Sequence, residues 1–234
     1  VGMEVVLADG TIQALRADHN YDGIGADLPG LMCASEGTLG IITAAVLKLY
    51  PRPADVATVF CAVAGARGAT AMLSRLRGAT GDGVTTFEYL NRACLDLVLE
   101  HIDATRDPFQ ARHGDYALIE LSSDREAAEA ALAGAIEAGE ALDAVIAESG
   151  RQADELWRLR ETIPEAQKHA GGSIKHDVSV PVSKIPEFLE AAEKKSLQIS
   201  PGSRLVTFGH IGDGNIHYNL SPAPDGDARA FPGD

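Results

Sequence analysis

The sequence predicts an α+β protein of the ferredoxin-like type, in which helices cover one face of an antiparallel sheet. From residue 56 onward, strand-like segments rich in β-branched residues alternate with helix-like segments. The connections between these segments are short, and 45% of the 234 residues are hydrophobic. That much apolar material is enough for a sizeable core, so a folded α+β protein is expected rather than a disordered chain.

The sequence of the first 52 residues predicts a separate, smaller domain. Asp9-Gly10 lies between the apolar runs 3–7 and 11–16, which is typical of a β-hairpin. Residues 18–30 predict a loop, and the β-branched run 41–49 predicts a further strand. Pro51-Arg52-Pro53 then predicts a boundary. We expect domains at 1–52 and 53–222, followed by a flexible tail at 223–234.

The sequence of the second domain predicts seven extended segments and five helices. The extended segments are 56–63, 84–89, 116–121, 145–147, 175–180, 205–208 and 216–220. The helices are 66–76, 92–102, 125–142, 154–166 and 183–197, with Asp124 as a helix cap. Pro164 predicts a break near the end of the fourth helix.

The composition argues against several classes of partner. Asp and Glu number 34 against 20 Lys and Arg, and the resulting net charge of −14 repels nucleic acid and anionic membranes. No apolar run approaches the roughly 18 residues of a membrane span. Three cysteines without a CxxC pair indicate reduced thiols, so a cytoplasmic protein is expected. An anionic ligand would need a local cluster of Arg and Lys.

Two glycines three residues apart, Gly37 and Gly40, lie directly before the predicted strand 41–49. Such spacing lets the backbone approach a ligand closely and expose its N–H groups. The segment is neither a GxGxxG fingerprint nor a phosphate-binding loop with a lysine. The alternative, which the segment taken alone favours, is a purely structural turn before a strand.

Two histidines, His210 and His217, flank a tight Gly-Asp-Gly-Asn turn. A hairpin there would bring both imidazoles together, and neutral imidazole suits a divalent metal, zinc above all. Two ligands do not hold a metal, so a third, such as a carboxylate, would have to come from elsewhere. The alternative is a pair of hydrogen-bonded core histidines.

Arg160 and Lys175 are candidates for binding an anion, because a guanidinium offers a planar fork to a carboxylate and an ammonium offers a point charge. The alternative for Arg160 is a surface ion pair with Glu161 or Glu165.

Five phrases resemble one family when they are taken together and in order. They are GMEVVLADG, SEGTLGIITAAVLKLYPRP, LWRLRETIPEA, KHDVSVPVSKIPEF and FGHIGDGNIHYNL. The combination resembles the FAD-linked D-2-hydroxyacid dehydrogenases and oxidases, a family that includes D-lactate dehydrogenase, the glycolate oxidase flavoprotein subunit and D-2-hydroxyglutarate dehydrogenase. The HxGDGNxH phrase is the most specific of the five.

The resemblance implies that residues 1–52 are the last part of a vanillyl-alcohol-oxidase-type FAD-binding domain. Residues from 53 onward would then be a substrate domain of the FAD-linked oxidase C-terminal type. By resemblance, the FAD contacts are Glu36, Gly37, Gly40, Ile41 and Ile42. The substrate carboxylate would meet Arg160, Lys175 and Asn219, and the metal ligands would be His210 and His217.

The implied partners are a 2-hydroxy acid and an electron acceptor, either a quinone, a cytochrome or an electron-transfer flavoprotein. A homodimer is also expected from the apolar surface that missing pieces would expose.

The chain also departs from the family's pattern. The first half of the FAD domain is absent, and so is the later segment that carries a Glu as third metal ligand and a His as the base. Pro164 stands where one type of member has Thr. We therefore expect a fragment that is inactive alone and does not contain its catalytic base. The alternatives are a non-catalytic carboxylate- or metal-binding module and, ranked last, a metal hydrolase.

Overall fold

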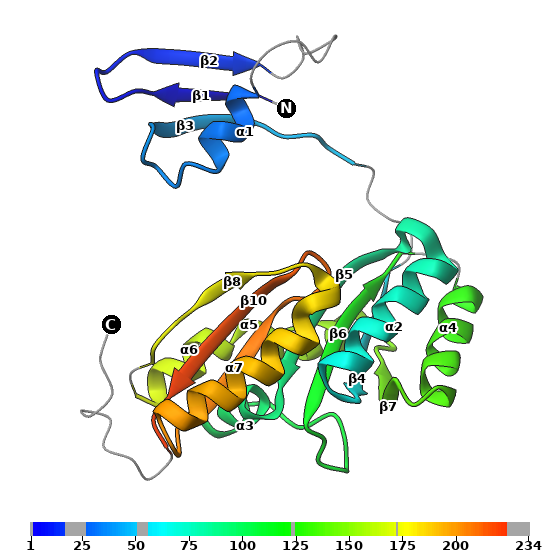
Figure 1. Ribbon diagram of the computed structural model, residues 1–234. Coiled ribbons are helices and arrows are strands. Elements are labelled where there is room, and N and C mark those ends of the chain that lie inside the picture. Colours follow the sequence, from blue (N-terminus) through cyan, green and yellow to red (C-terminus); the bar gives the residue numbers. More distant parts are fainter. Residues whose placement is uncertain (1, 17–26, 51–55, 123–124, 172, 224–234) are drawn as a thin grey trace. The chain divides into compact units, whose positions relative to one another are not determined.

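The structure is a computed structural model that describes residues 2–16, 27–50, 56–122, 125–171 and 173–223 (Figure 1). The chain divides into two compact units, Val1–Arg52 and Pro53–Asp234. The predicted boundary at 51–53, the predicted cap at Asp124 and residues 224–234 of the predicted tail lie outside the described residues. Within the described residues, none of the helices has the length and apolar character needed to cross a membrane.

The first unit is a three-stranded antiparallel sheet in the order β2-β1-β3, with one short helix. Its elements are β1 (Gly2–Val6), β2 (Ile12–Arg16), α1 (Leu28–Cys33) and β3 (Ile41–Val46). The predicted hairpin is confirmed, with Gly10 at φ 84 in its turn. The loop expected at 18–30 is partly wrong, since its last residues begin α1. Asp27 caps this helix by accepting the Gly30 N–H at 3.0 Å.

The second unit is built on a seven-stranded antiparallel sheet in the order β7-β4-β6-β5-β9-β10-β8. The strands are β4 (Ala57–Val63), β5 (Val84–Asn91), β6 (Asp115–Leu121), β7 (Ala141–Ile146), β8 (Asp177–Ser179), β9 (Arg204–His210) and β10 (Asn215–Ser221). The helices are α2 (Gly65–Thr80), α3 (Arg92–His101), α4 (Arg125–Glu137), α5 (Gly150–Glu161), α6 (Ile163–His169) and α7 (Ile185–Ile199). The predicted α+β class with an antiparallel sheet is confirmed.

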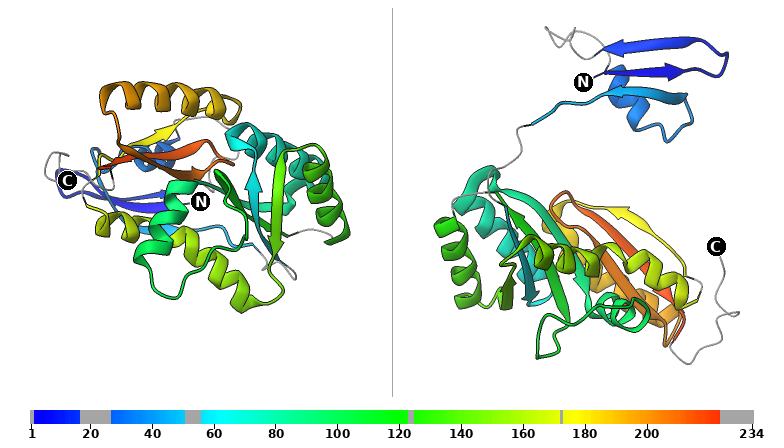
Figure 2. Two further views of the ribbon diagram at one scale, coloured as in Figure 1. Left: turned by 90° about the horizontal axis from the view of Figure 1, so that it is seen from below. Right: turned by 180° about the vertical axis from the view of Figure 1, so that it is seen from behind.

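Helices cover both faces of this sheet, which corrects the expectation of one covered face (Figure 2). One core lies under α2, α4 and α7, and a second core lies under α3, α5 and α6. The physical reason is visible in β4, where every residue from Thr58 to Val63 is buried. A strand that is apolar on both faces must be covered on both faces.

Two predicted helices end differently from the prediction. The helix expected at 154–166 is two helices that meet at Thr162, and Pro164 lies in the first turn of α6, so the predicted break is confirmed. The helix expected at 125–142 stops at Glu137, and β7 follows from Ala141. Gly139, at φ 70, allows the chain to leave the helix there.

Candidate functional site

The predicted polar residues of the second unit share one face of the sheet, the face covered by α5 and α6. In an antiparallel pair, residues directly opposite each other project to the same side. His210 lies opposite Glu88 of β5, and His217 lies opposite both Phe208 of β9 and Asp177 of β8. The sheet register therefore lines up a row of ionisable side chains from β5 to β8.

Glu88, on β5, lies at one end of this row, and sequence reasoning missed it. Its side chain is 2% exposed. One carboxylate oxygen, Oε2, accepts a hydrogen bond from Nε of Arg160 at 2.8 Å. The other, Oε1, lies 2.5 Å from Nδ1 of His210. A single buried carboxylate thus joins a predicted substrate residue to a predicted metal ligand.

Arg160 is itself buried, with 10% of its side chain exposed, so the alternative of a surface pair with a neighbouring glutamate is wrong. Its guanidinium lies 4.7 Å from the centroid of the Phe208 ring. Because Nε is engaged by Glu88, the two terminal nitrogens form the edge that remains for a ligand. The contacts therefore hold the guanidinium in one orientation.

The contact with Glu88 also orients His210. A neutral imidazole that donates its Nδ1 proton to a carboxylate keeps Nε2 as an acceptor. The Nε2 atom is then the one available to a metal or a substrate. This is the arrangement expected of a histidine that binds a ligand rather than of a core histidine.

His217 has different neighbours. Its ring lies 4.9 Å from the Phe208 ring, and its Nδ1 atom is 3.4 Å from Oδ1 of Asp177. Since His217 lies opposite Phe208, two residues before His210, the two histidines are diagonal neighbours on one face. Diagonal neighbours in an antiparallel pair are separated by roughly 7–8 Å. Among the described residues, no three His, Cys, Asp or Glu side chains form a metal-binding group. The structure thus brings the two histidines near each other without a third ligand.

Asn219 and Lys175 lie at the far end of the row. Asn219 is 4% exposed and donates to Oε1 of Gln167 on α6 at 3.1 Å, while its own oxygen accepts the His176 N–H at 3.2 Å. The Ile174–Leu220 bridge sets the register that places Lys175 opposite Asn219. The buried Nε2 atom of Gln167 has no hydrogen-bond partner among the described residues. The three predicted substrate residues therefore share one face, in the order Arg160, Asn219, Lys175 across the sheet.

The turn between β9 and β10 depends on glycine. Gly214 has φ +89, and a Cβ atom there would meet the carbonyl oxygen of Val180 at 2.1 Å. A side chain at Gly209 would meet the carbonyl oxygen of Asn215 at 2.4 Å. These close approaches explain why the phrase between the two histidines is rich in glycine.

A cavity of about 390 Å³ adjoins Glu88 and His210. Trp157 of α5 also lines it and donates its indole N–H to Oε1 of Glu120 at 2.8 Å. Trp157 was assigned no role from the sequence, although it lies on the same helix as Arg160. The buried carboxylate of Glu88 and the aromatic ring of Trp157 therefore line the same cavity.

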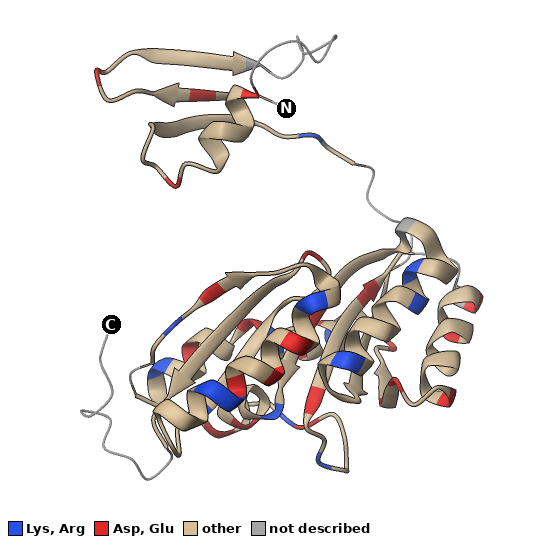
Figure 3. Ribbon diagram, viewed as in Figure 1, with Lys and Arg blue, Asp and Glu red and all other residues tan. Residues whose placement is uncertain are grey.

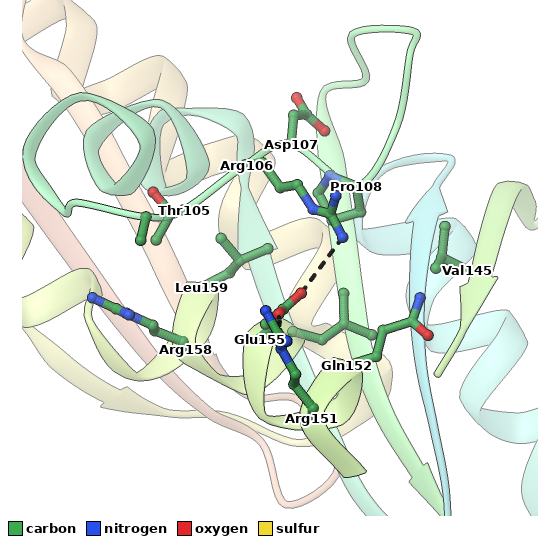
Figure 4. Close-up of a pocket in the computed structure, with 12 residues that line it drawn as sticks. Thr105, Arg106, Asp107, Pro108, Val145, Arg151, Gln152, Glu155, Arg158 and Leu159 are labelled. Carbon is green, nitrogen blue, oxygen red and sulfur yellow. Dashed lines mark hydrogen bonds and ion pairs between the residues drawn. The ribbon is translucent and has the colours of Figure 1, made fainter. Parts of the chain in front are cut away.

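A separate cavity of about 810 Å³ lies between α5 and the segment 104–108 (Figure 4). Arg106 and Arg151 both contact Glu155 there, at 3.5 and 3.1 Å. None of the residues predicted for the site lines this cavity. The candidate site is thus the smaller cavity, which Glu88 and His210 line.

The predicted flavin-contacting residues lie in the first unit. Glu36 and Gly37 form a turn with positive φ values of 49 and 80, and Ile41 and Ile42 open strand β3 with 62% and 44% of their surface exposed. A Cβ atom at Gly40 would meet the Val6 carbonyl oxygen at 2.9 Å. Close packing of β3 against β1 therefore explains Gly40, which supports the structural alternative at that position.

Solved structures share this fold at low sequence identity. The structure of p-cresol methylhydroxylase with substrate bound matches with a TM-score of 0.64 and 15% identity, covering 94% of this chain and 50% of that one. The 4-ethylphenol oxidase from Gulosibacter chungangensis matches with a TM-score of 0.58 and 16% identity, covering 94% and 50%. At these identities the likeness shows the fold alone.

Curated relatives match at higher identity. D-2-hydroxyglutarate dehydrogenases from Arabidopsis thaliana and Rattus norvegicus, both named as mitochondrial, and one from Stutzerimonas stutzeri are each 34% identical to this chain. The matches cover 95%, 94% and 94% of this chain and 40%, 42% and 47% of the respective relatives. The chain thus spans less than half the length of these relatives. The family model for FAD linked oxidases, C-terminal domain, matches residues 52–230, and the chain belongs to that family.

Proposed function

We propose that this chain forms the substrate-binding part of an FAD-dependent dehydrogenase that oxidises a D-2-hydroxy acid to the 2-oxo acid. The observation that carries the proposal is the buried group in which Glu88 holds both Arg160 and His210. It offers an oriented guanidinium edge, and its carboxylate and imidazole border one cavity. A 2-hydroxy acid presents a matching carboxylate and hydroxyl. The relatives' names make 2-hydroxyglutarate the first substrate to test.

In this proposal Arg160 binds the carboxylate next to the hydroxyl. Its terminal nitrogens are suited to two parallel charge-assisted hydrogen bonds, and the Phe208 ring supports the guanidinium from the side. Lys175 and Asn219 contribute a second cation and an amide on the same face. Such fixed donors orient the substrate so that the hydrogen on the hydroxyl-bearing carbon faces one direction.

FAD, when bound, supplies the acceptor for the hydride from that carbon. In the first unit, the positive-φ turn at Glu36 and Gly37 offers backbone N–H groups of the kind that contact a nucleotide. All six residues of β3 are exposed, among them Ile41, Ile42 and Val46. Such a surface is typical of a sheet that packs within a larger domain. We therefore propose residues 1–52 as part of the FAD-binding domain.

We further propose that a divalent metal such as zinc binds at this site. His210, through Nε2, and His217 would hold it, and its chemistry would be to lower the pKa of the substrate hydroxyl. The diagonal placement of the two imidazoles fits this role. Within the described residues, these two imidazoles are the metal ligands that we propose, so the proposal requires a further ligand. No catalytic base is assigned among the described residues.

The remaining expectations stay predictions from sequence. They are the electron acceptor (quinone, cytochrome or electron-transfer flavoprotein), the homodimer and the cytoplasmic location.

The test is anaerobic mixing of the FAD-loaded protein that carries this chain with D-2-hydroxyglutarate, followed by the flavin absorbance. We expect the D isomer to bleach the oxidised flavin and the L isomer to leave it unchanged. Arg160→Lys keeps the charge but loses the fork, and should weaken substrate binding roughly 10- to 100-fold. Arg106→Lys, on an exposed pair, is the control. Binding of the acid without any flavin bleaching would instead identify a non-catalytic module.

A further inference from the structure

The cavity of about 810 Å³ beside α5 is separate from the candidate site (Figure 4). One wall is α5, which contributes the polar row Arg151, Glu155 and Arg158, spaced four and three residues apart on one face of the helix. The opposite wall is the segment 104–108. Arg160, on the same helix, does not line this cavity. The helix therefore borders two different spaces.

The segment opposite α5 is held in one conformation by its own contacts. Asp107 pairs at 2.6 Å with Arg92, whose side chain is 14% exposed, and its other carboxylate oxygen accepts the Phe109 N–H at 3.0 Å. The Thr105 hydroxyl donates to the carbonyl oxygen of Ile102 at 2.7 Å. Because these contacts involve no ligand, the wall is formed before a ligand binds, which lowers the entropy cost of binding.

Two contacts join the walls across the cavity. Arg158 of α5 donates through Nη2 to the carbonyl oxygen of Asp103 at 3.0 Å. Arg106 points toward Glu155 of α5, with 3.5 Å between Nη2 and Oε2 (Figure 4). Because these contacts bridge the space, it suits a compact molecule better than an extended polypeptide. Its volume also lies within the usual range for small-molecule sites, about 300–1,000 Å³.

The cavity carries more positive than negative charge, unlike the chain as a whole. Acidic residues outnumber basic ones by 34 to 20 and are spread over both units (Figure 3). At the cavity, Arg106 and Arg151 share one carboxylate, that of Glu155, at 3.5 and 3.1 Å. The other acidic side chain there is the one that pairs with Arg92. Arg158 has no carboxylate partner among the described residues. An anionic ligand would supply that partner.

The remaining lining of the cavity is largely aliphatic. It includes Val145 of β7, Leu156 and Leu159 of α5, and Pro108. None of the 12 lining residues is aromatic, so the cavity offers no ring to stack on a nucleobase or a flavin. Each CH₂ group that a ligand buries against such a surface raises its affinity roughly fourfold. The lining therefore favours an anion with a hydrocarbon chain.

We propose that this cavity binds an aliphatic carboxylate, with the carboxylate at Arg158 and the hydrocarbon chain against Leu156 and Leu159. The contact with Asp103 engages one nitrogen of the Arg158 guanidinium, so its other N–H groups remain for a charge-assisted hydrogen bond. The proposal does not rest on the proposed function, because none of the residues assigned to the candidate site lines the cavity.

The experiment measures the binding of octanoate, butyrate and octanol by calorimetry, using the FAD-loaded protein that carries this chain. Butyrate keeps the charge with a shorter chain, and octanol keeps the chain without the charge. The variants are Arg158→Met and Arg158→Lys. Arg67→Met is the control, since Arg67 is exposed and pairs with Glu190 away from the cavity. The midpoint of thermal unfolding of each variant checks that it is folded.

We expect octanoate to bind at least about tenfold more tightly than butyrate or octanol. Arg158→Met should weaken octanoate binding about 10- to 100-fold, Arg158→Lys should recover part of the loss, and Arg67→Met should match the unaltered protein. The proposal is overturned if octanoate does not bind, if octanol binds as tightly, or if Arg158→Met and Arg67→Met bind octanoate equally. Loss of octanoate binding in Arg160→Lys would place the ligand at the candidate site and overturn the assignment as well.

Discussion

Replacing Glu88 by Leu should destabilise the second unit strongly, because it leaves a buried guanidinium without its anion. Glu88 is 2% exposed and the Arg160 side chain is 10% exposed, so solvent offers little compensation to either charge. His210 loses the acceptor of its Nδ1 atom in the same step. The substitution therefore removes the hydrogen-bond partner of both Arg160 and His210, and the leucine side chain can offer only apolar contacts in its place.

The size of the effect follows from this burial. Removing one partner of a buried ion pair costs about 3–5 kcal/mol, since the remaining charge stays desolvated. For a unit of this size, each kcal/mol lowers the unfolding midpoint by roughly 2–4 °C. The midpoint of Glu88→Leu should thus fall by roughly 6–20 °C. The same substitution at Glu190, whose side chain is 62% exposed beside Arg67, should cost at most about 1 kcal/mol.

The assay is thermal and chemical denaturation followed by far-UV circular dichroism, applied to Glu88→Leu, Glu190→Leu, Arg160→Met and the double variant Glu88→Leu with Arg160→Met. The double variant removes both buried charges, so it should be more stable than Glu88→Leu alone, with a coupling of about 0.5–3 kcal/mol. If Glu88→Leu is as stable as Glu190→Leu, the pair is not buried in solution and the reasoning is refuted. If the double variant loses the sum of the two single losses, the two residues do not act as a pair.

Two further predictions concern titratable groups. Burial raises the pKa of the Cys61 and Cys94 thiols to about 12, whereas Cys33 is exposed, so a thiol reagent at pH 8 should modify one cysteine in the native protein and three after denaturation. Burial also raises the pKa of Asp115, so the fold binds this proton more tightly than the unfolded chain does. Stability should therefore fall as pH rises through the folded-state pKa, and Asp115→Asn should remove that fall in denaturation measured from pH 3 to 7.

Much of the second unit's fold was predictable because local patterns agree with the tertiary structure. Alternating strand-like and helix-like runs gave the class, and Pro164 marked the break between α5 and α6. The number of covered faces was missed, although the continuous apolar run from Thr58 to Val63 carried that signal. The edge strand β7 was also largely missed, since its residues Ala141–Ile146 follow an alanine-rich helix with no change in composition. Only the turn at Gly139 separates the two elements.

The site residues were predictable where the residue type itself indicates a chemical role, as for Arg160 and His210. Glu88 was not, because in the alternating run VTTFEYLN an acidic residue between Phe87 and Tyr89 is typical of the exposed face of a strand. It lies inside because α5 covers that face and supplies Arg160 as a partner. The role of Glu88 depends on a contact across 72 residues of sequence, which local patterns do not encode.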